Sequence, residues 1–291
     1  MRDIPNEEMA ALWNGVSGQA WVDEQPLLDR TYEPIEALLV EAVATSGARA
    51  VLDIGCGAGA TTLAVARRLG PAGQVTGVDV SEPLLAVARQ RAEKSAPTAR
   101  FIRADAQIHA FAPASFDLMI SRFGVMFFDD PFAAFANLHR AATPAAEMRL
   151  VVFRSIQENP FMTTAERAAA PLLATLPTRK PDGPGQFAFA DPDRVREVLE
   201  DSGWSQAGFA PLDVQCRFPA ADLPRYLTRL GPLGQALRAA DASTREHVTR
   251  EVRAAFEPFV RGPQVEFTAA CWMISARATP GSDQRDTAGR R

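Results

Sequence analysis

Three aspartates stand directly after short apolar segments of the sequence, where their carboxylates could bind a polar ligand. Asp53 precedes the glycine cluster 55–59, Asp79 lies within Gly-Val-Asp-Val-Ser, and Asp105 lies within Arg-Ala-Asp-Ala-Gln. Taken singly, such an aspartate is better explained as the cap of a turn or a helix. Three of them at three successive strand ends favour a shared binding site, because the carboxyl ends of parallel strands form one edge of a sheet.

The glycine cluster 55–59 would let a ligand approach the backbone closely, since glycine has no side chain to block it. The cluster also opens a helical pattern, and the first N–H groups of a helix can bind an anionic group. The spacing G-x-G-x-x-A over 55–60, followed by Asp79 about 20 residues later, also satisfies the dinucleotide-binding fingerprint. A nicotinamide-dependent oxidoreductase is therefore one alternative.

Asp53 argues against a dinucleotide. Its carboxylate lies two residues before the first glycine, where it would repel a pyrophosphate but attract the ammonium group of an amino-acid cofactor. The residues therefore favour a ligand that carries an amino-acid part.

Apolar runs and helical patterns alternate along the chain and predict a doubly wound α/β fold with a parallel sheet. We expect strands at 50–54, 74–78, 100–103, 116–121, 150–153, 209–218 and 265–276. We expect helices at 59–69, 84–93 and 131–142 and after a capping Asp191. The fold class is thus a Rossmann-like, mostly parallel, seven-stranded sheet with helical insertions that form a lid. The expected parts are a helical cap at 1–48, a binding domain at 49–278 with insertions at about 154–190 and 221–260, and a flexible tail at 279–291.

The run Val-Leu-Asp-Ile-Gly-Cys-Gly-Ala-Gly at 51–59 resembles the first motif of the class I S-adenosyl-L-methionine (SAM)-dependent methyltransferases. The chain is also similar to a group of bacterial small-molecule methyltransferases through SRFGVMFFDDP, ENPF at 158–161 and GPGQFAFAD at 183–191. One departure lies at 144–146, where Pro-Ala-Ala replaces the usual Pro-Gly-Gly before the fifth strand. This change affects a turn far from the cofactor.

The resemblance implies SAM as the cofactor and assigns expected roles along the strand ends. Asp53 would lie near the methionine ammonium, Asp79 would bind both ribose hydroxyls, and Asp105 would bind the adenine amino group. The other residues expected at the cofactor are Gly55, Cys56, Gly57, Gly59, Val80, Ala106, Ser121 and Trp21.

The end of the fourth strand, in SRFGVMFF, is where the family's cofactor pocket meets its substrate pocket. The residues expected to contact the substrate are Arg122, Phe123, Met126, Phe127 and Phe161. Their mostly apolar character suggests a small hydrophobic acceptor, methylated on O, N or C by in-line displacement. Because SAM already carries a reactive methyl group, alignment of the acceptor can suffice without an acid or base. A SAM-binding protein without methyl transfer, cyclase-like or regulatory, is the main alternative.

The tryptophans of the N-terminal segment could serve function or packing. Trp21 or Tyr32 could offer an aromatic face to the sulfonium, or the tryptophans could simply dock a helix.

His109, between the third and fourth strands, is the weak candidate for a general base. His139 and His247 are expected on solvated helix faces. Asp129 and Asp130 precede a proline as a helix cap would, so no metal is expected.

Composition bounds the remaining possibilities. The chain has 291 residues, 47% apolar and 23% charged, with a formal net charge of −4, which argues against general nucleic-acid binding. Three separated cysteines and the lack of a signal peptide or membrane-spanning run predict a cytoplasmic protein that contacts neither nucleic acid nor membrane. The partner expected is a small-molecule acceptor. The sequence leaves the oligomeric state open between monomer and homodimer, and the role of Arg179 and Lys180 open between a solvated turn and contact with an acidic substrate.

Overall fold

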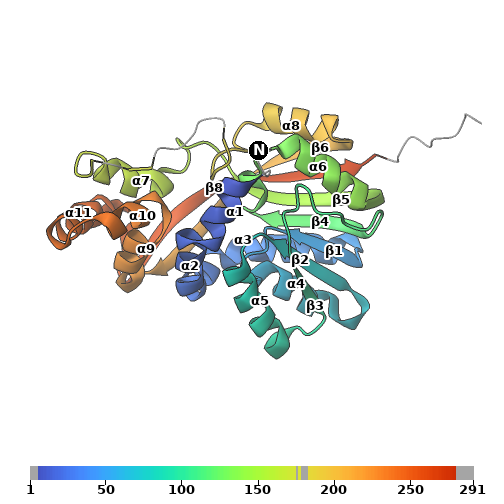
Figure 1. Ribbon diagram of the computed structural model, residues 1–291, viewed down its shortest axis with the longest axis horizontal. Coiled ribbons are helices and arrows are strands. Elements are labelled where there is room, and N and C mark those ends of the chain that lie inside the picture. The colour runs from blue at the N-terminus through green and yellow to red at the C-terminus, as the bar shows by residue number, and fades with distance from the viewer. Residues whose placement is uncertain (1–5, 175, 178–182, 280–291) are drawn as a thin grey trace, which may run out of the picture.

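The protein folds around one twisted sheet, whose strands lie side by side from β6 at the top to β3 at the bottom of Figure 1. The computed structural model describes residues 6–174, 176–177 and 183–279. The strand order is β3-β2-β1-β4-β5-β8-β6. Five strands are parallel: β3 (Ala99–Arg103), β2 (Gln74–Asp79), β1 (Ala50–Ile54), β4 (Phe116–Arg122) and β5 (Ala142–Phe153). β8 (Gln264–Ala278) and β6 (Trp204–Pro219) are antiparallel, and the two-residue β7 (Val260–Arg261) pairs with β8. The doubly wound, mostly parallel sheet is confirmed.

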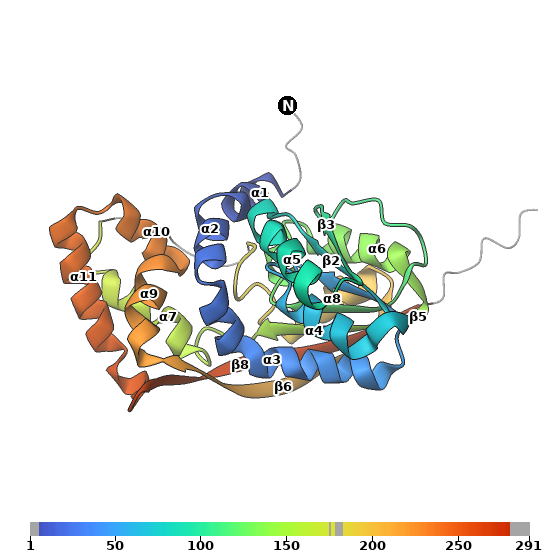
Figure 2. The ribbon, with the colours of Figure 1, turned by 90° about the horizontal axis from the view of Figure 1, so that it is seen from below.

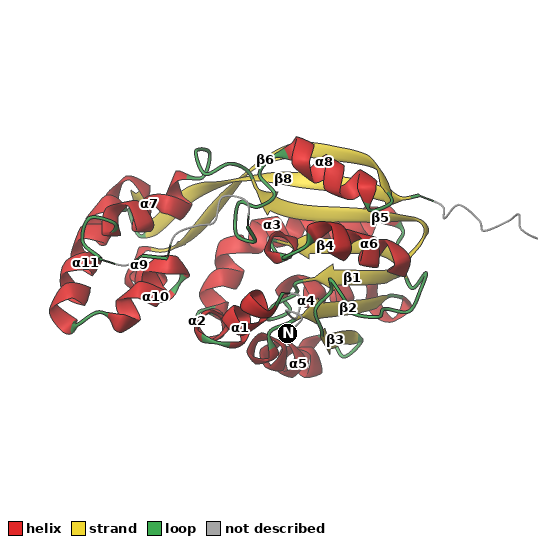
Figure 3. Cartoon of the chain, turned by 45° about the horizontal axis from the view of Figure 1, so that its top comes forward, coloured by secondary structure: helices red, strands yellow, loops and turns green. Residues whose placement is uncertain are grey.

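Helices cover both faces of this sheet (Figure 3). α3 (Gln25–Ser46), α4 (Ala60–Leu69) and α5 (Glu82–Ser95) lie on one face. α6 (Pro131–Ala141) and α8 (Pro192–Asp201) lie on the other. Short 3₁₀ turns occur at η1 (Gly70–Ala72), η2 (Val125–Phe127), η3 (Ala220–Asp222) and η4 (Glu257–Phe259). None of these helices, nor any other in the described residues, is long and apolar enough to cross a membrane.

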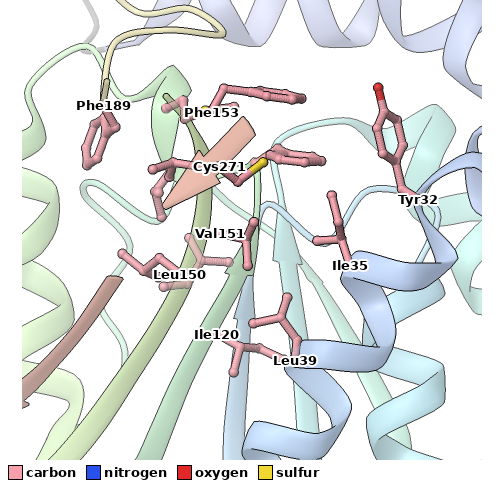
Figure 4. Close-up of a cluster of buried hydrophobic side chains, with 14 of the residues drawn as sticks. Tyr32, Ile35, Leu39, Ile120, Leu150, Val151, Phe153, Phe189 and Cys271 are labelled. Carbon is pink, nitrogen blue, oxygen red and sulfur yellow. The ribbon is translucent and has the colours of Figure 1, made fainter. Parts of the chain in front are cut away.

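The helix that precedes the first strand seals the core. Along α3, Ile35, Leu39 and Val43 recur every four residues, so they form one apolar stripe, and each is fully buried. Figure 4 shows Ile35 and Leu39 facing the sheet residues Ile120 and Val151. This packing fixes the N-terminal helices against the carboxyl ends of the strands.

Two groups of helices stand beyond those strand ends. The N-terminal group contains α1 (Glu7–Asn14) and α2 (Val16–Asp23). The second group contains α7 (Pro160–Ala169), α9 (Leu223–Arg229), α10 (Gly231–Ala239) and α11 (Ala242–Ala255). Figure 2 shows the second group at the far end of the long antiparallel pair β6 and β8, with α2 between this group and α5. We call the second group the lid helices.

The sequence misplaces the start of β5. We expected a turn at 144–146 and a strand from 150, but β5 begins at Ala142. Ala145 there has φ +65°, a conformation that glycine adopts more easily. The strand therefore passes through a residue whose backbone is strained.

Two predicted helix caps are confirmed. Asp191 Oδ1 accepts a hydrogen bond from Asp193 N at 2.9 Å and caps α8. Asp130 Oδ1 accepts from Ala133 N at 3.0 Å and caps α6. The acidic pair at 129–130 is thus explained by the helix that it precedes.

Candidate active site

The loop between β1 and α4 brings a buried carboxylate to the strand end. Gly55, Gly57 and Gly59 all have positive φ, which a bulkier residue would adopt only with strain. Asp53, just before them, is 1% exposed, and Thr62 Oγ1 donates to its Oδ2 at 2.6 Å. Burial raises the pKa of Asp53 to about 7, although the Thr62 hydrogen bond and the Arg122 charge oppose the rise.

Asp79 ties this loop to the loop after β2. Its Oδ2 accepts from Gly57 N at 2.8 Å, and its Oδ1 accepts from Ser81 N at 2.8 Å. Burial raises the pKa of Asp79, and the two backbone N–H groups oppose the rise. Asp79 therefore holds the glycine loop in place, and its carboxylate also faces the cavity beside it.

Asp105 occupies the equivalent position after β3. Its Oδ1 accepts from Gln107 N at 2.9 Å, while its Oδ2 is buried and has no hydrogen-bond partner in the described residues. Burial raises the pKa of this carboxyl, against the effects of the Gln107 N–H and of the nearby Asn6 side chain. An acceptor is thus left available for a ligand that donates a hydrogen bond.

The end of β4 packs directly against the glycine loop. Ser121 is fully buried; its hydroxyl donates to Ile54 O at 2.7 Å and accepts from Gly124 N at 3.1 Å. A Cβ on Gly55 would lie 2.5 Å from Gly124 Cα, so both positions need glycine. Between them Phe123 has φ +67°, an unusual conformation for a bulky residue. Such strain is characteristic of functional sites.

Two small cavities flank this junction, of about 110 and 50 Å³. The larger runs past Asp79, Val80, Asp105 and Ala106, and the smaller runs past Asp53, Cys56 and Thr61. Both are bounded by Gly55, Gly57 and Arg122.

Buried polar atoms that lack a hydrogen-bond partner gather around these two cavities. Within the described residues they include Asn6 Oδ1, Thr61 Oγ1, Asp105 Oδ2 and Arg122 Nη1. Because an unpaired buried polar group is costly, this gathering indicates a site for a polar ligand. That ligand would need both hydrogen-bond donors and an anionic acceptor.

A third cavity of about 440 Å³ lies between the N-terminal helices and the lid helices. We call it the chamber. Its aromatic lining comprises Trp13, Trp21, Tyr32, Phe123, Phe127, Phe153, Phe161, Tyr226 and Phe256. Trp21 and Phe123 line the chamber and both small cavities, so the three spaces adjoin at these residues.

Hydrogen bonds attach the N-terminal helices to the loop after β2 on one side and to the lid helices on the other. Ser81 Oγ donates to Trp13 O at 2.6 Å, and Asn14 Nδ2 donates to Val80 O at 2.9 Å, which fixes α1 to the loop after β2. On the lid side, Gln235 Nε2 donates to Ser17 Oγ at 3.0 Å.

An ion cluster strengthens the attachment to the lid. Glu24, whose side chain is 0% exposed, pairs with Arg225 at 2.9 Å and Arg229 at 3.1 Å. Of these three residues, Arg229 also lines the chamber.

Known proteins resemble this chain in sequence and in fold. Residues 51–145 match a family described as a methyltransferase domain. Nocamycin O-methyltransferase of Saccharothrix syringae is 28% identical over 66% of this chain and 71% of its own length. Demethylmenaquinone methyltransferase of Renibacterium salmoninarum is 26% identical over 71% of this chain and 88% of its own. The solved structure of phosphoethanolamine N-methyltransferase 2 of Haemonchus contortus, a complex with SAM, aligns with a TM-score of 0.57 at 16% identity, over 96% of this chain and 61% of that one.

These similarities support a class I SAM-dependent methyltransferase, with residues 51–145 in its methyltransferase domain. SAM is therefore its cofactor, and the unpaired polar atoms fit such a ligand. Asp105 Oδ2 lacks a donor, which an adenine amino group provides, and Arg122 Nη1 lacks an acceptor, which a carboxylate provides.

The structure brings most of the predicted cofactor residues of this methyltransferase together. Those that line the two small cavities are Trp21, Asp53, Gly55, Cys56, Gly57, Asp79, Val80, Asp105 and Ala106. Of the predicted substrate residues, Phe123, Met126, Phe127 and Phe161 line the chamber. Arg122 lines the two small cavities, on the side of the cofactor.

Three predicted residues have other surroundings. A Cβ on Gly59 would lie 3.0 Å from Ala88 Cβ and Phe101 Cζ, so Gly59 permits close packing of α4 against α5 and β3. The Ser121 hydroxyl is used by the backbone, as described above. His109 lies against Phe111, with ring centroids 4.6 Å apart, and lines none of the three cavities. Arg179 and Lys180 lie outside the described residues.

Sequence reasoning missed contributions from α1 and α9. Asn6, Met9 and Trp13 line the larger cofactor cavity, and Tyr226 lines the chamber. The only signal for the N-terminal set was its tryptophan content. No local sequence pattern marks Tyr226 as a chamber residue, because its position depends on how the antiparallel strands β6 and β8 place α9.

Proposed function

We propose that this methyltransferase transfers the methyl group of SAM to an O, N or C atom of a small, largely apolar molecule bound in the chamber. The main support for the proposal is that the chamber and both cofactor cavities share the lining residues Trp21 and Phe123, so the three spaces adjoin there. A chamber of about 440 Å³ suits a small organic molecule rather than a macromolecule. Its aromatic lining favours an apolar one.

The polar residues of the small cavities would hold the cofactor in a fixed orientation. Asp79 accepts hydrogen bonds from the ribose hydroxyls, and Asp105 Oδ2 accepts one from the adenine amino group. Asp53 attracts the ammonium of the methionine part, and Arg122 attracts its carboxylate. Each assignment places an opposite charge or a complementary hydrogen bond at a group that the protein leaves buried.

Bound SAM would supply a methyl group on a positively charged sulfur. Transfer of that group to an electron pair of the acceptor would leave S-adenosylhomocysteine (SAH), and the methylated atom would lose a proton. The protein's own contribution is alignment. Trp21 and Phe123 lie at the junction through which acceptor and methyl group must meet, and a fixed geometry can replace several kcal/mol of orientational entropy. The cap and lid helices exclude water from this junction.

A label-transfer experiment tests the proposal. The purified protein is incubated with SAM labelled in its methyl group and with three acceptor classes: apolar hydroxylated naphthoquinones and phenols, a bulk tRNA fraction, and a mixed peptide library. We expect label in the apolar extract together with stoichiometric SAH. Label found only in tRNA or peptide would contradict the proposal.

A further inference from the structure

The chain contains two tyrosines, and both line the chamber. Tyr32 comes from α3 and Tyr226 comes from α9 of the lid, so the fold brings together residues that are far apart in sequence. The two side chains lie close enough for each to affect the ionisation of the other. The pair therefore adds two hydroxyl groups to the aromatic part of the chamber lining, which also contains the polar residues Glu8, Ser17, Glu166, Gln186, Arg229 and Gln235.

Aromatic contacts fix the rings of both tyrosines. Tyr32 is 6% exposed and meets Phe123 edge-on, with centroids 5.4 Å apart. Tyr226 stacks on Phe218 at 5.1 Å and lies against Phe161 at 5.5 Å. Figure 4 shows the Tyr32 hydroxyl pointing away from Ile35 and Leu39. The hydroxyls are thus held in place by the packing of their rings.

The two hydroxyls keep at least one hydrogen available for a ligand. Two phenols carry two O–H donors, and even a hydrogen bond between them would use only one. Burial raises the pKa of both Tyr32 and Tyr226, so both stay protonated at neutral pH. Among the described residues neither hydroxyl has a further hydrogen-bond partner. An unused donor beside apolar surface is costly, so an incoming oxygen would be favoured there.

One member of the pair also borders a cofactor cavity. Tyr32 also lines the smaller cofactor cavity, together with Asp53 and Cys56, and it contacts Phe123 at the junction. Tyr226 lines the chamber but neither cofactor cavity. A ligand oxygen bound by the pair would therefore lie close to the reacting centre.

We infer that Tyr32 and Tyr226 form an oxygen-binding site that positions the acceptor, and that the acceptor is an apolar compound bearing a phenolic, enolic or carbonyl oxygen next to or at the methylated atom. This inference rests on the proposed function, which it narrows to a class of substrate. The tyrosines are positioning residues, since the bound oxygen is oriented by them.

Equilibrium dialysis of the SAH-saturated protein with 2-naphthol and 2-methylnaphthalene tests the inference. The two probes have nearly the same shape, and only the first has an oxygen. One hydrogen bond is worth about 0.5–1.5 kcal/mol, so Tyr226→Phe should weaken 2-naphthol binding about threefold to tenfold. Binding of 2-methylnaphthalene should change less than twofold. Met162→Leu, at another chamber residue, should change both affinities in parallel.

Equal effects of Tyr226→Phe on both probes, or no binding of 2-naphthol to the wild-type protein, would overturn the inference. Tyr32→Phe provides the same comparison if Tyr226→Phe does not fold, as judged by SAH binding. Failure of the proposed function looks different, because apolar acceptors would then receive no methyl label whatever the two variants do to probe binding.

Discussion

Gly124 and Gly55 lie in direct backbone contact in the loops that follow β4 and β1. A Cβ on Gly124 would lie 2.7 Å from Gly55 Cα and 2.4 Å from Ile54 O. The contact brings the strained Phe123 and the glycine loop together at the edge of both cofactor cavities. The shape of the cofactor site therefore depends on two residues that have no side chain.

Gly124→Ala should weaken SAH binding by at least tenfold. The added methyl group meets backbone atoms, which cannot move without displacing the loop that bounds the cofactor cavities. Gly185→Ala is the matched control, because a Cβ there would have no neighbour within 4 Å. Calorimetric titration of both variants with SAH checks the prediction, and equal affinities would refute it.

The buried Asp53 should make stability depend on pH. Its pKa is about 7 in the folded protein, against about 3.9 in an unfolded chain. Between pH 4 and 7 the unfolded state releases this proton and the folded state keeps it. The contribution of Asp53 to the free energy of unfolding is therefore fully present below pH 4 and lost as the pH rises to 7.

Comparison with Asp53→Asn isolates this contribution, since all other titrating groups are shared. From pH 5 to pH 7, the unfolding free energy of the wild type should fall by about 2 kcal/mol relative to the variant. Urea unfolding of both proteins at the two pH values measures the difference. A constant difference would mean that Asp53 is ionised throughout.

Ala145→Gly should stabilise the protein. Ala145 is exposed and has φ +65°, and the left-handed conformation costs a residue with a Cβ about 1 kcal/mol or more. The gain should raise the thermal midpoint by about 2–4 °C. Ala136→Gly, within α6, should lower it by a similar amount. A lower midpoint for Ala145→Gly would show that this backbone is not strained.

The strand ends were predictable because each depends on a local pattern. β1 spans the expected residues, and the three aspartates lie at strand ends as the sequence indicated: Asp53 near the end of β1, Asp79 at the end of β2 and Asp105 just after β3. The start of β5 was missed because Pro144 and Ala145 occupy positions where a turn is usual. Residues 143–146 have no partner in β4 and form an irregularity between the pairs Phe116–Ala142 and Leu118–Glu147, so the strand continues past them.

The chamber could not be predicted, because its walls come from distant parts of the chain. Tyr226 and Arg229 belong to α9, which is inserted between the long antiparallel strands β6 and β8. These strands carry α9 toward the N-terminal helices. Arg122 was assigned to the substrate, yet it faces the cofactor cavities. The direction of the Arg122 side chain depends on how the end of β4 packs against the glycine loop. The alternation of apolar and polar residues in the sequence does not predict that contact.

Removing the cations around Glu24 should destabilise the attachment of the lid. Arg225→Met with Arg229→Met would leave a buried carboxylate without a partner, which costs about 3 kcal/mol. Methionine retains the apolar stem of each side chain. In the control Arg250→Met, the lost pair with Glu251 is exposed, so the change should be below about 1 kcal/mol. Urea unfolding compares the two, and equal losses would show that the ion cluster around Glu24 does not stabilise the attachment of the lid.

The central claim is that the acceptor occupies the chamber while SAM occupies the adjoining cavities. Ala165 lines the chamber but neither cofactor cavity. The most direct test is the rate of methyl transfer to the best apolar acceptor by Ala165→Phe, measured together with SAH affinity. A ring that fills the chamber should reduce methyl transfer at least tenfold and leave SAH affinity within twofold of the wild type. Unchanged methyl transfer in a protein that still binds SAH would show that the acceptor binds elsewhere and would contradict the account.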